Sequence, residues 1–140
     1  MSHLRSKGVG LLLRILALEA MSVVVVASRL LPYRRWRLIA LRTSRVRSPT
    51  IAHAVTRERI VHAVDEASRL MPFGKNCLVR AITARGMLAL YGYQSRLIIG
   101  VAKSPAGDLE SHAWLEHNGK VVIGGDVEPF TRLPDLDGKL

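Results

Sequence analysis

The chain has 140 residues, of which 49% are hydrophobic and 23% are charged, and its formal net charge is +10. This length suits one domain with a modest hydrophobic core, and the composition excludes a globally disordered chain. Cys77 is the one cysteine in the sequence, which excludes an intramolecular disulfide and a cysteine-rich zinc site. A thiol that stays reduced predicts a cytoplasmic protein.

The positive charge is concentrated near the N-terminus. Residues 1–50 contain ten Lys and Arg residues against one acid, Glu19, which gives +9. Residues 51–140 contain eleven against ten, which gives +1. Such a basic segment predicts an acidic partner, and nucleic acid, anionic lipid, an acidic peptide and a partner protein all fit.

The first predicted element is a helix over the apolar stretch 9–31, which Pro32 ends. Its longest uncharged run, residues 20–28, is far shorter than the roughly 20 apolar residues of a membrane span. A signal peptide also fits poorly, because no small-residue cleavage site follows. We therefore expect a helix that is buried or faces a partner protein, with a position on a membrane surface as the alternative. The stretch is interrupted by three charged residues, Arg14, Glu19 and Arg29.

Two more helices are predicted before the cysteine. Residues 33–47 suit a short basic helix with Trp36 among its apolar positions, and Ser48-Pro49-Thr50 suits a break. Residues 51–70 suit the next helix, because apolar side chains recur there at helical spacing. These side chains are Ile60, Val61, Val64 and Ala67.

The C-terminal half changes from helix to strand. Asn76 is a candidate N-cap for a helix over 77–91, and Gly92 is a candidate stop. Asn118-Gly119 predicts a tight hairpin turn, and the tail from Asp126 is expected to be irregular. Helices come first and antiparallel strands follow, which predicts the α+β class. The predicted strands are 96–101, 111–117 and 120–123.

Cys77 and His112 are the candidate catalytic residues. A cysteine in the first turn of a helix lies among unpaired amides that favour the thiolate and can hold an oxyanion. His112 lies in a strand on the same face as Trp114 and Glu116, because side chains alternate along a strand. Together they supply the nucleophile and the base of an acyl-transfer site. Taken singly, each residue also suits a structural role, the cysteine as a small buried side chain.

A third group is expected to orient the imidazole. The hairpin returns the chain beside His112, and Asp126 is the first acid after the last predicted strand. We predict that Asp126 takes this role, with Glu116 as the alternative.

Two motifs resemble a known family. The sequence Cys77-Leu78-Val79-Arg80-Ala81, followed by His112-Ala113-Trp114-Leu115-Glu116 and Gly119, is similar to the lasso-peptide B2 family of transglutaminase-like cysteine peptidases. Residues 31–37 also resemble the N-terminal part of that family. One departure stands out, because family members often carry the triad aspartate at the position that falls on Gly124 here.

The resemblance implies a transglutaminase-like, papain-like cysteine peptidase core with N-terminal helices and a small antiparallel sheet. One domain over 1–140 is expected, with a basic helical part (1–49) and the catalytic core (50–140). The implied activity is leader cleavage from a ribosomally made lasso-peptide precursor, through a Cys77–His112–Asp126 thioester mechanism without metal or other cofactor. A separate B1 leader-recognition protein and an ATP-dependent cyclase are implied partners.

Two other functions remain possible from the sequence, and one segment is a candidate docking surface. A transglutaminase-like acyltransferase passes through the same thioester, and a basic nucleic-acid-binding helical module would explain only the N-terminal charge. We expect four residues near the N-terminus to dock the B1–leader complex, and Trp114 to line the site. The alternative is that Trp36 packs in the core while the arginines are solvated. The four docking residues are Arg34, Arg35, Trp36 and Arg37.

Overall fold

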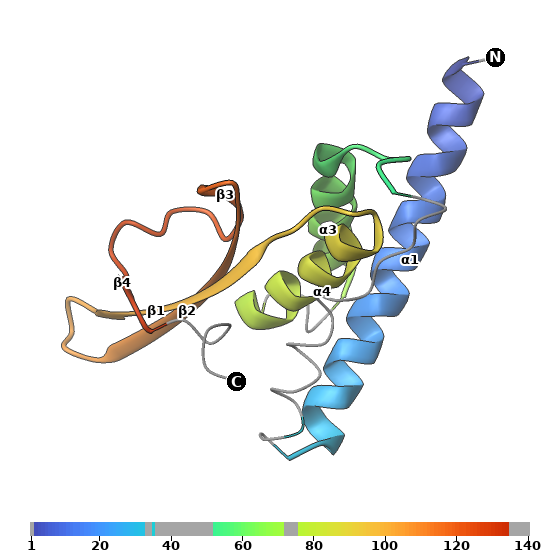
Figure 1. The fold of residues 1–140 in the computed structure, drawn as a ribbon. Coiled ribbons are helices and arrows are strands. Elements are labelled where there is room, and N and C mark those ends of the chain that lie inside the picture. The colour runs from blue at the N-terminus through green and yellow to red at the C-terminus, as the bar shows by residue number, and fades with distance from the viewer. Residues whose placement is uncertain (1, 33–34, 36–51, 72–75, 135–140) are drawn as a thin grey trace.

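The computed structural model describes residues 2–32, 35, 52–71 and 76–134. Within these residues three helices precede a four-stranded antiparallel sheet, so the α+β prediction is confirmed (Figure 1). The helices are α1 (Ser2–Leu30), α3 (Arg57–Leu70) and α4 (Cys77–Leu90). The strands are β1 (Arg96–Lys103), β2 (Leu109–His117), β3 (Lys120–Ile123) and β4 (Thr131–Arg132). The predicted boundary at residues 49–50 and the predicted helix over 33–47 lie outside the described residues, except for Arg35, which is helical.

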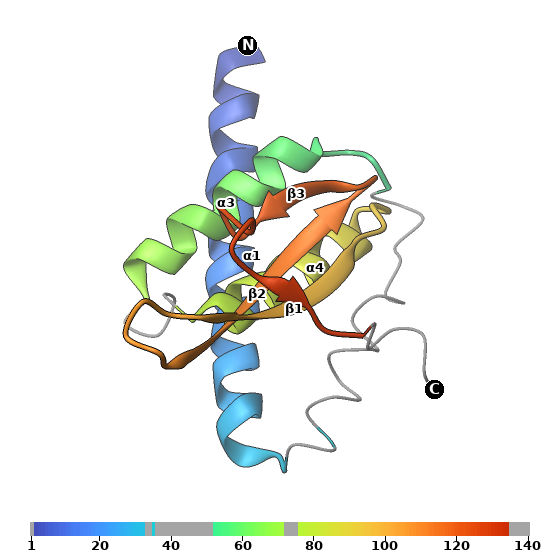
Figure 2. The same ribbon diagram turned by 90° about the vertical axis from the view of Figure 1, so that its left-hand side faces the viewer.

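The molecule is layered, with α4 in the middle. α1 packs against α3 and α4, and α4 packs against the sheet, chiefly β2. Figure 2 views the sheet face-on, with α1 behind the other two helices. Burial of apolar side chains between these layers is the main favourable term in folding. The largest fully buried side chains in this core are Met21, Ile60, Ile82, Leu88 and Leu115.

α1 is half-embedded in this core. Leu13, Ala17 and Met21 are buried, and Pro32 follows the helix end as predicted. The opposite side of the helix carries exposed apolar side chains. Gly8–Leu30 is long and apolar enough to cross a membrane by length and composition, and 22% of its apolar 18-residue window is buried inside the protein. The expectation of a buried helix is therefore met on one side of α1.

α3 begins later than the sequence suggested. The predicted start was residue 51, whereas the helix begins at Arg57 after Thr56 in an extended conformation. Two features prevent helix before it: His53 has a φ of +57°, in the left-handed region, and its N–H donates to the Tyr91 carbonyl at 2.9 Å. This hydrogen bond ties the segment to the end of α4 instead.

Both predicted caps of α4 are present. The Asn76 side chain accepts hydrogen bonds from the amides of Leu78 (3.0 Å) and Val79 (3.4 Å), as an N-cap does. At the other end Gly92 has a φ of +85°. Tyr93 N–H donates to the Leu88 carbonyl at 2.8 Å, and Gly92 N–H donates to that of Ala89, which is the Schellman termination.

The sheet has the order β3-β2-β1-β4. Asn118 and Gly119 have φ values of +50° and +76°, as a type I′ hairpin turn requires, so this prediction is confirmed. The prediction of an irregular tail from Asp126 is wrong in one place, because Thr131 and Arg132 form β4 and pair with β1. The sequence did not indicate this strand, because two residues are too few to show the alternation of apolar and polar side chains that marks a strand.

Candidate active site

Cys77 is the first residue of α4. Its side chain is half-buried against the hydrophobic core and is not part of a disulfide. The Asn76 side chain is occupied by the amides of Leu78 and Val79, so the Cys77 amide is not one of its donors. The positive end of the helix dipole favours an anion here, whether thiolate or oxyanion.

His112 lies in the middle of β2, opposite Gly100 of β1. Its Nε2 is 2.7 Å from the carbonyl oxygen of Gly124. A carbonyl oxygen only accepts hydrogen bonds, so Nε2 carries the proton in the neutral imidazole and Nδ1 is the basic nitrogen. The geometry thus selects one tautomer of His112.

Gly124 occupies the position where the resembling family often has an aspartate, and the structure leaves no room for one. A Cβ at Gly124 would lie 2.3 Å from Cβ of Trp114, and the φ of Gly124 is +128°. Both the contact and the backbone conformation disfavour any side chain. The backbone carbonyl of this residue contacts the imidazole instead.

Asp126 is exposed, and its Oδ1 accepts a hydrogen bond from the Glu128 amide at 3.1 Å. The carboxylate thus stabilises the turn that follows β3. The imidazole contact described for His112 is with Gly124, so the orienting role of Asp126 stays a prediction.

An aromatic cluster packs against His112. The Phe130 ring lies 5.0 Å from the imidazole between ring centroids, and the Trp114 ring stacks on it at 6.0 Å. The absence of a side chain at Gly100 makes the cluster possible, because a Cβ there would come within 3 Å of both aromatic residues. Sequence reasoning missed Gly100 and Phe130 as neighbours of the histidine, whereas the resemblance had marked the position of Gly124.

Trp114 is 1% exposed. Its Nε1 donates to Oε1 of Glu116 at 3.1 Å, so the predicted common face of His112, Trp114 and Glu116 is consistent with their contacts. Little Trp114 surface remains for a substrate, and its contact with His112 suits a positioning role. Its predicted part in binding substrate is otherwise untested.

Glu116 is a buried carboxylate, 5% exposed. Arg132 of β4 forms an ion pair with it, and the Arg132 guanidinium lies 5.8 Å from the Trp114 ring centroid. A buried carboxylate requires such partners. Glu116 therefore joins β2 to β4 across the aromatic cluster. These contacts occupy the Glu116 carboxylate, which was the alternative to Asp126 as the group that orients the imidazole.

Cys77 and His112 belong to elements that pack together. In both ribbon views the yellow-green start of α4 lies beside the β1–β2 pair (Figures 1 and 2). In the described part of the chain the hydrogen bond and ring contacts of His112 are with Gly124, Trp114 and Phe130, and none is with Cys77. The catalytic pairing of thiol and imidazole stays a prediction, since catalytic hydrogen bonds are often long without substrate.

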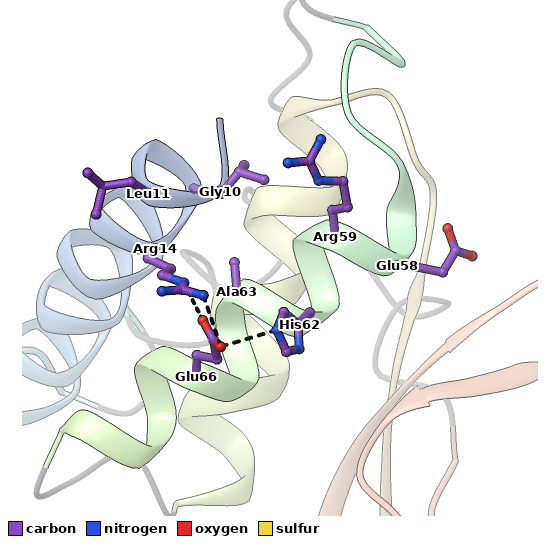
Figure 3. A pocket seen from close by; sticks show the side chains of 9 residues that line it. Gly10, Leu11, Arg14, Glu58, Arg59, His62, Ala63 and Glu66 are labelled. Atoms are coloured by element: carbon purple, nitrogen blue, oxygen red, sulfur yellow. Dashed lines mark hydrogen bonds and ion pairs between the residues drawn. The ribbon is translucent and has the colours of Figure 1, made fainter. Parts of the chain in front are cut away.

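The predicted docking residues Arg34, Trp36 and Arg37 lie outside the described residues, and Arg35 is exposed. A cavity of about 490 Å³ lies between α1 and α3, lined by Arg14, His62 and Glu66 among others (Figure 3). It includes neither candidate catalytic residue. No group of three or more His, Cys, Asp or Glu side chains within the described ranges is placed to hold a metal ion.

Comparison with protein families matched most of the chain to a known superfamily. The model of the transglutaminase-like superfamily matches residues 21–135, which contain the described α3, α4 and sheet. Comparisons with curated proteins and with solved structures found no match. Because the matched region covers most of the 140 residues, the chain belongs to the transglutaminase-like superfamily.

Proposed function

We propose that the protein is a cysteine peptidase that removes the leader from a ribosomally made lasso-peptide precursor. The observation that supports the chemistry most directly is the Nε2 contact of His112 with the Gly124 carbonyl, which leaves Nδ1 free to act as the base. The Cys77 position at a capped helix start supports a thiolate nucleophile. The choice of substrate rests on the motifs around Cys77 and His112.

In this mechanism Nδ1 of His112 takes the proton of the Cys77 thiol. The thiolate attacks the scissile carbonyl carbon, and the Cys77 amide stabilises the resulting oxyanion. The imidazolium returns its proton to the leaving amine as the C–N bond breaks, which leaves a thioester on Cys77. Water then attacks the thioester while Nδ1 takes its proton, and the leader carboxylate and the free thiol are released.

The Gly124 carbonyl provides weaker support for an imidazolium than a carboxylate does, because it carries no net charge. It still fixes the ring orientation and the tautomer. Asp126 would then contribute through the local field and through the turn it stabilises, which is a smaller role than in a triad.

The proposal includes a separate B1 protein that presents the leader, with Arg34, Arg35, Trp36 and Arg37 as its docking residues. The precursor peptide and the ATP-dependent cyclase complete the expected partners, and the reaction takes place in the cytoplasm. No cofactor enters any step of this mechanism.

The test is cleavage of precursor in the presence of B1, followed by mass spectrometry. Cys77→Ala is expected to abolish cleavage, because no other thiol is available. His62→Ala is the matched control, since His62 is an exposed histidine of α3 outside the candidate site. Cleavage by Cys77→Ala at the wild-type rate contradicts the peptidase proposal.

An acyltransferase is the second candidate, because the thioester on Cys77 also reacts with amines. Adding a primary amine to the same assay distinguishes the two. Accumulation of the amide in place of the free leader carboxylate favours the acyltransferase. Loss of both products in Cys77→Ala shows that they share one thioester.

A further inference from the structure

One side of α1 is an unpartnered apolar face. Leu13, Ala17 and Met21 are buried against α3 and α4. On the other side six large apolar side chains are 45–77% exposed. At 100° per residue they fall within roughly a 120° arc, so they form one stripe along the helix. We call this stripe the outer face of α1; its members are Leu11, Leu12, Ile15, Val23, Val26 and Leu30.

The outer face is unusual for a helix that only packs in a core. The segment Gly8–Leu30 has 23 residues and includes an 18-residue window with a mean hydropathy of 2.3, of which only 22% is buried. Its length is about 35 Å, from a rise of 1.5 Å per residue. Soluble monomers rarely leave this many large apolar side chains exposed along one face of a helix.

The charges around the helix indicate what covers this face. Residues 1–50 carry ten Lys and Arg residues against Glu19 alone. Arg5 and Lys7 precede the apolar segment, and Arg29, Arg34, Arg35 and Arg37 lie at or after its end. An apolar face with basic residues at both ends matches an anionic lipid surface, where hydrocarbon receives the face and headgroups pair with the cations.

We propose that the outer face of α1 lies in the interface of an anionic phospholipid bilayer, with the helix axis parallel to the membrane. This proposal does not depend on the peptidase function. It takes the membrane-surface alternative over the expected buried or partner-facing helix, although three charges, Arg14, Glu19 and Arg29, lie within the stretch. Only Glu19 among them projects from the middle of the outer face, and the cost of burying a carboxylate holds the helix at headgroup depth.

Contacts on the inner side favour the parallel orientation over a membrane-spanning one. Arg14 forms an ion pair with Glu66 of α3, and Glu66 Oε1 is 3.1 Å from His62 Nε2 (Figure 3). If α1 crossed the membrane, these contacts of Glu66 with Arg14 and His62 would have to break. It would also expose the buried Ile60 and Val64 of α3 to water.

The experiment is flotation of the full chain with vesicles of phosphatidylcholine alone and of phosphatidylcholine mixed with phosphatidylglycerol. Binding is expected to the anionic vesicles, and to weaken as salt is raised. The double variant Leu12→Gln/Val26→Gln is expected to lower the apparent partition coefficient by about tenfold or more. The control is Leu109→Gln, because Leu109 of β2 is 77% exposed and lies outside α1; wild-type binding is expected.

Several outcomes overturn the proposal. These are the absence of binding to anionic vesicles, equal binding to both vesicle types, and unchanged binding of the double variant. Retention of the protein on vesicles after an alkaline wash overturns the parallel orientation. A further outcome is that the wild type does not bind vesicles, and that the double variant loses either a dimer seen in sedimentation or binding to B1. The outer face is then a protein-binding surface. Circular dichroism of the double variant checks that it is folded, as expected for exposed positions.

Discussion

The Nε2 atom of His112 lies 2.7 Å from the carbonyl oxygen of Gly124. In a Cys–His–Asp site a carboxylate would usually accept the hydrogen bond from this nitrogen. Here a backbone carbonyl does so, at a glycine whose close contact with Trp114 excludes a side chain. The candidate base is therefore oriented by the backbone.

His112→Ala is expected to be as inactive in leader cleavage as Cys77→Ala, because a nucleophile and its base act as a unit. The double variant Cys77→Ala/His112→Ala should lose no more activity than either single variant. Both rates are measured by mass spectrometry of the precursor with B1. Appreciable cleavage by His112→Ala means that another group is the base.

Asp126→Asn is expected to keep partial activity, within about tenfold of the wild type. Its Oδ1 can still accept the hydrogen bond from the Glu128 amide, and the imidazole retains the Gly124 carbonyl. The kcat of the variant across a pH series is the measurement. A loss as complete as that of His112→Ala makes Asp126 the essential orienting group.

Gly124→Ala is expected to reduce the free energy of unfolding by about 2–5 kcal/mol, from left-handed backbone strain and the overlap with Trp114. Gly125→Ala is the matched control, since its φ is +67° but nothing lies within 4 Å of its Cβ position. It should cost about 1–2 kcal/mol. Urea denaturation compares the two, and equal losses would show that Trp114 yields to the added methyl group.

Glu116→Gln is expected to reduce the free energy of unfolding by about 1–2 kcal/mol. The amide oxygen can still accept from Trp114 Nε1, while the charge facing Arg132 is lost. The exposed Glu110→Gln on the same strand should change stability by less than about 0.5 kcal/mol. A folded but inactive Glu116→Gln would instead assign Glu116 to the catalytic machinery.

Charge reversal of Arg34 and Arg35 to Glu is expected to raise the apparent KM for leader-bound B1, and more so at low salt. The maximal rate should change little, because these residues take no part in the chemistry. Steady-state kinetics at two salt concentrations are the measurement. Salt-dependent DNA binding that the same reversals remove would favour the nucleic-acid-binding alternative.

The local signals in the sequence were sufficient for most elements. Asn76 and Gly92 fixed the ends of α4, and Asn118-Gly119 fixed the hairpin, because caps and tight turns depend on the backbone preferences of one or two residues. The order of helices and strands gave the α+β class. Cys77 and His112 were recognisable as candidates because a helix start and a strand face are both local features.

The surroundings of His112 were decided by the tertiary structure. Gly124 lies 12 residues beyond it and reaches it at the end of β3, the strand paired with β2. Phe130 and Arg132 lie 18 and 20 residues beyond it and reach it or its neighbours where β4 pairs with β1. No periodicity marks a two-residue strand or a backbone carbonyl as a partner, since any residue carries a carbonyl. The exposure of one side of α1 likewise could not be predicted from the sequence, because an apolar sequence does not show which side of the helix its neighbours cover.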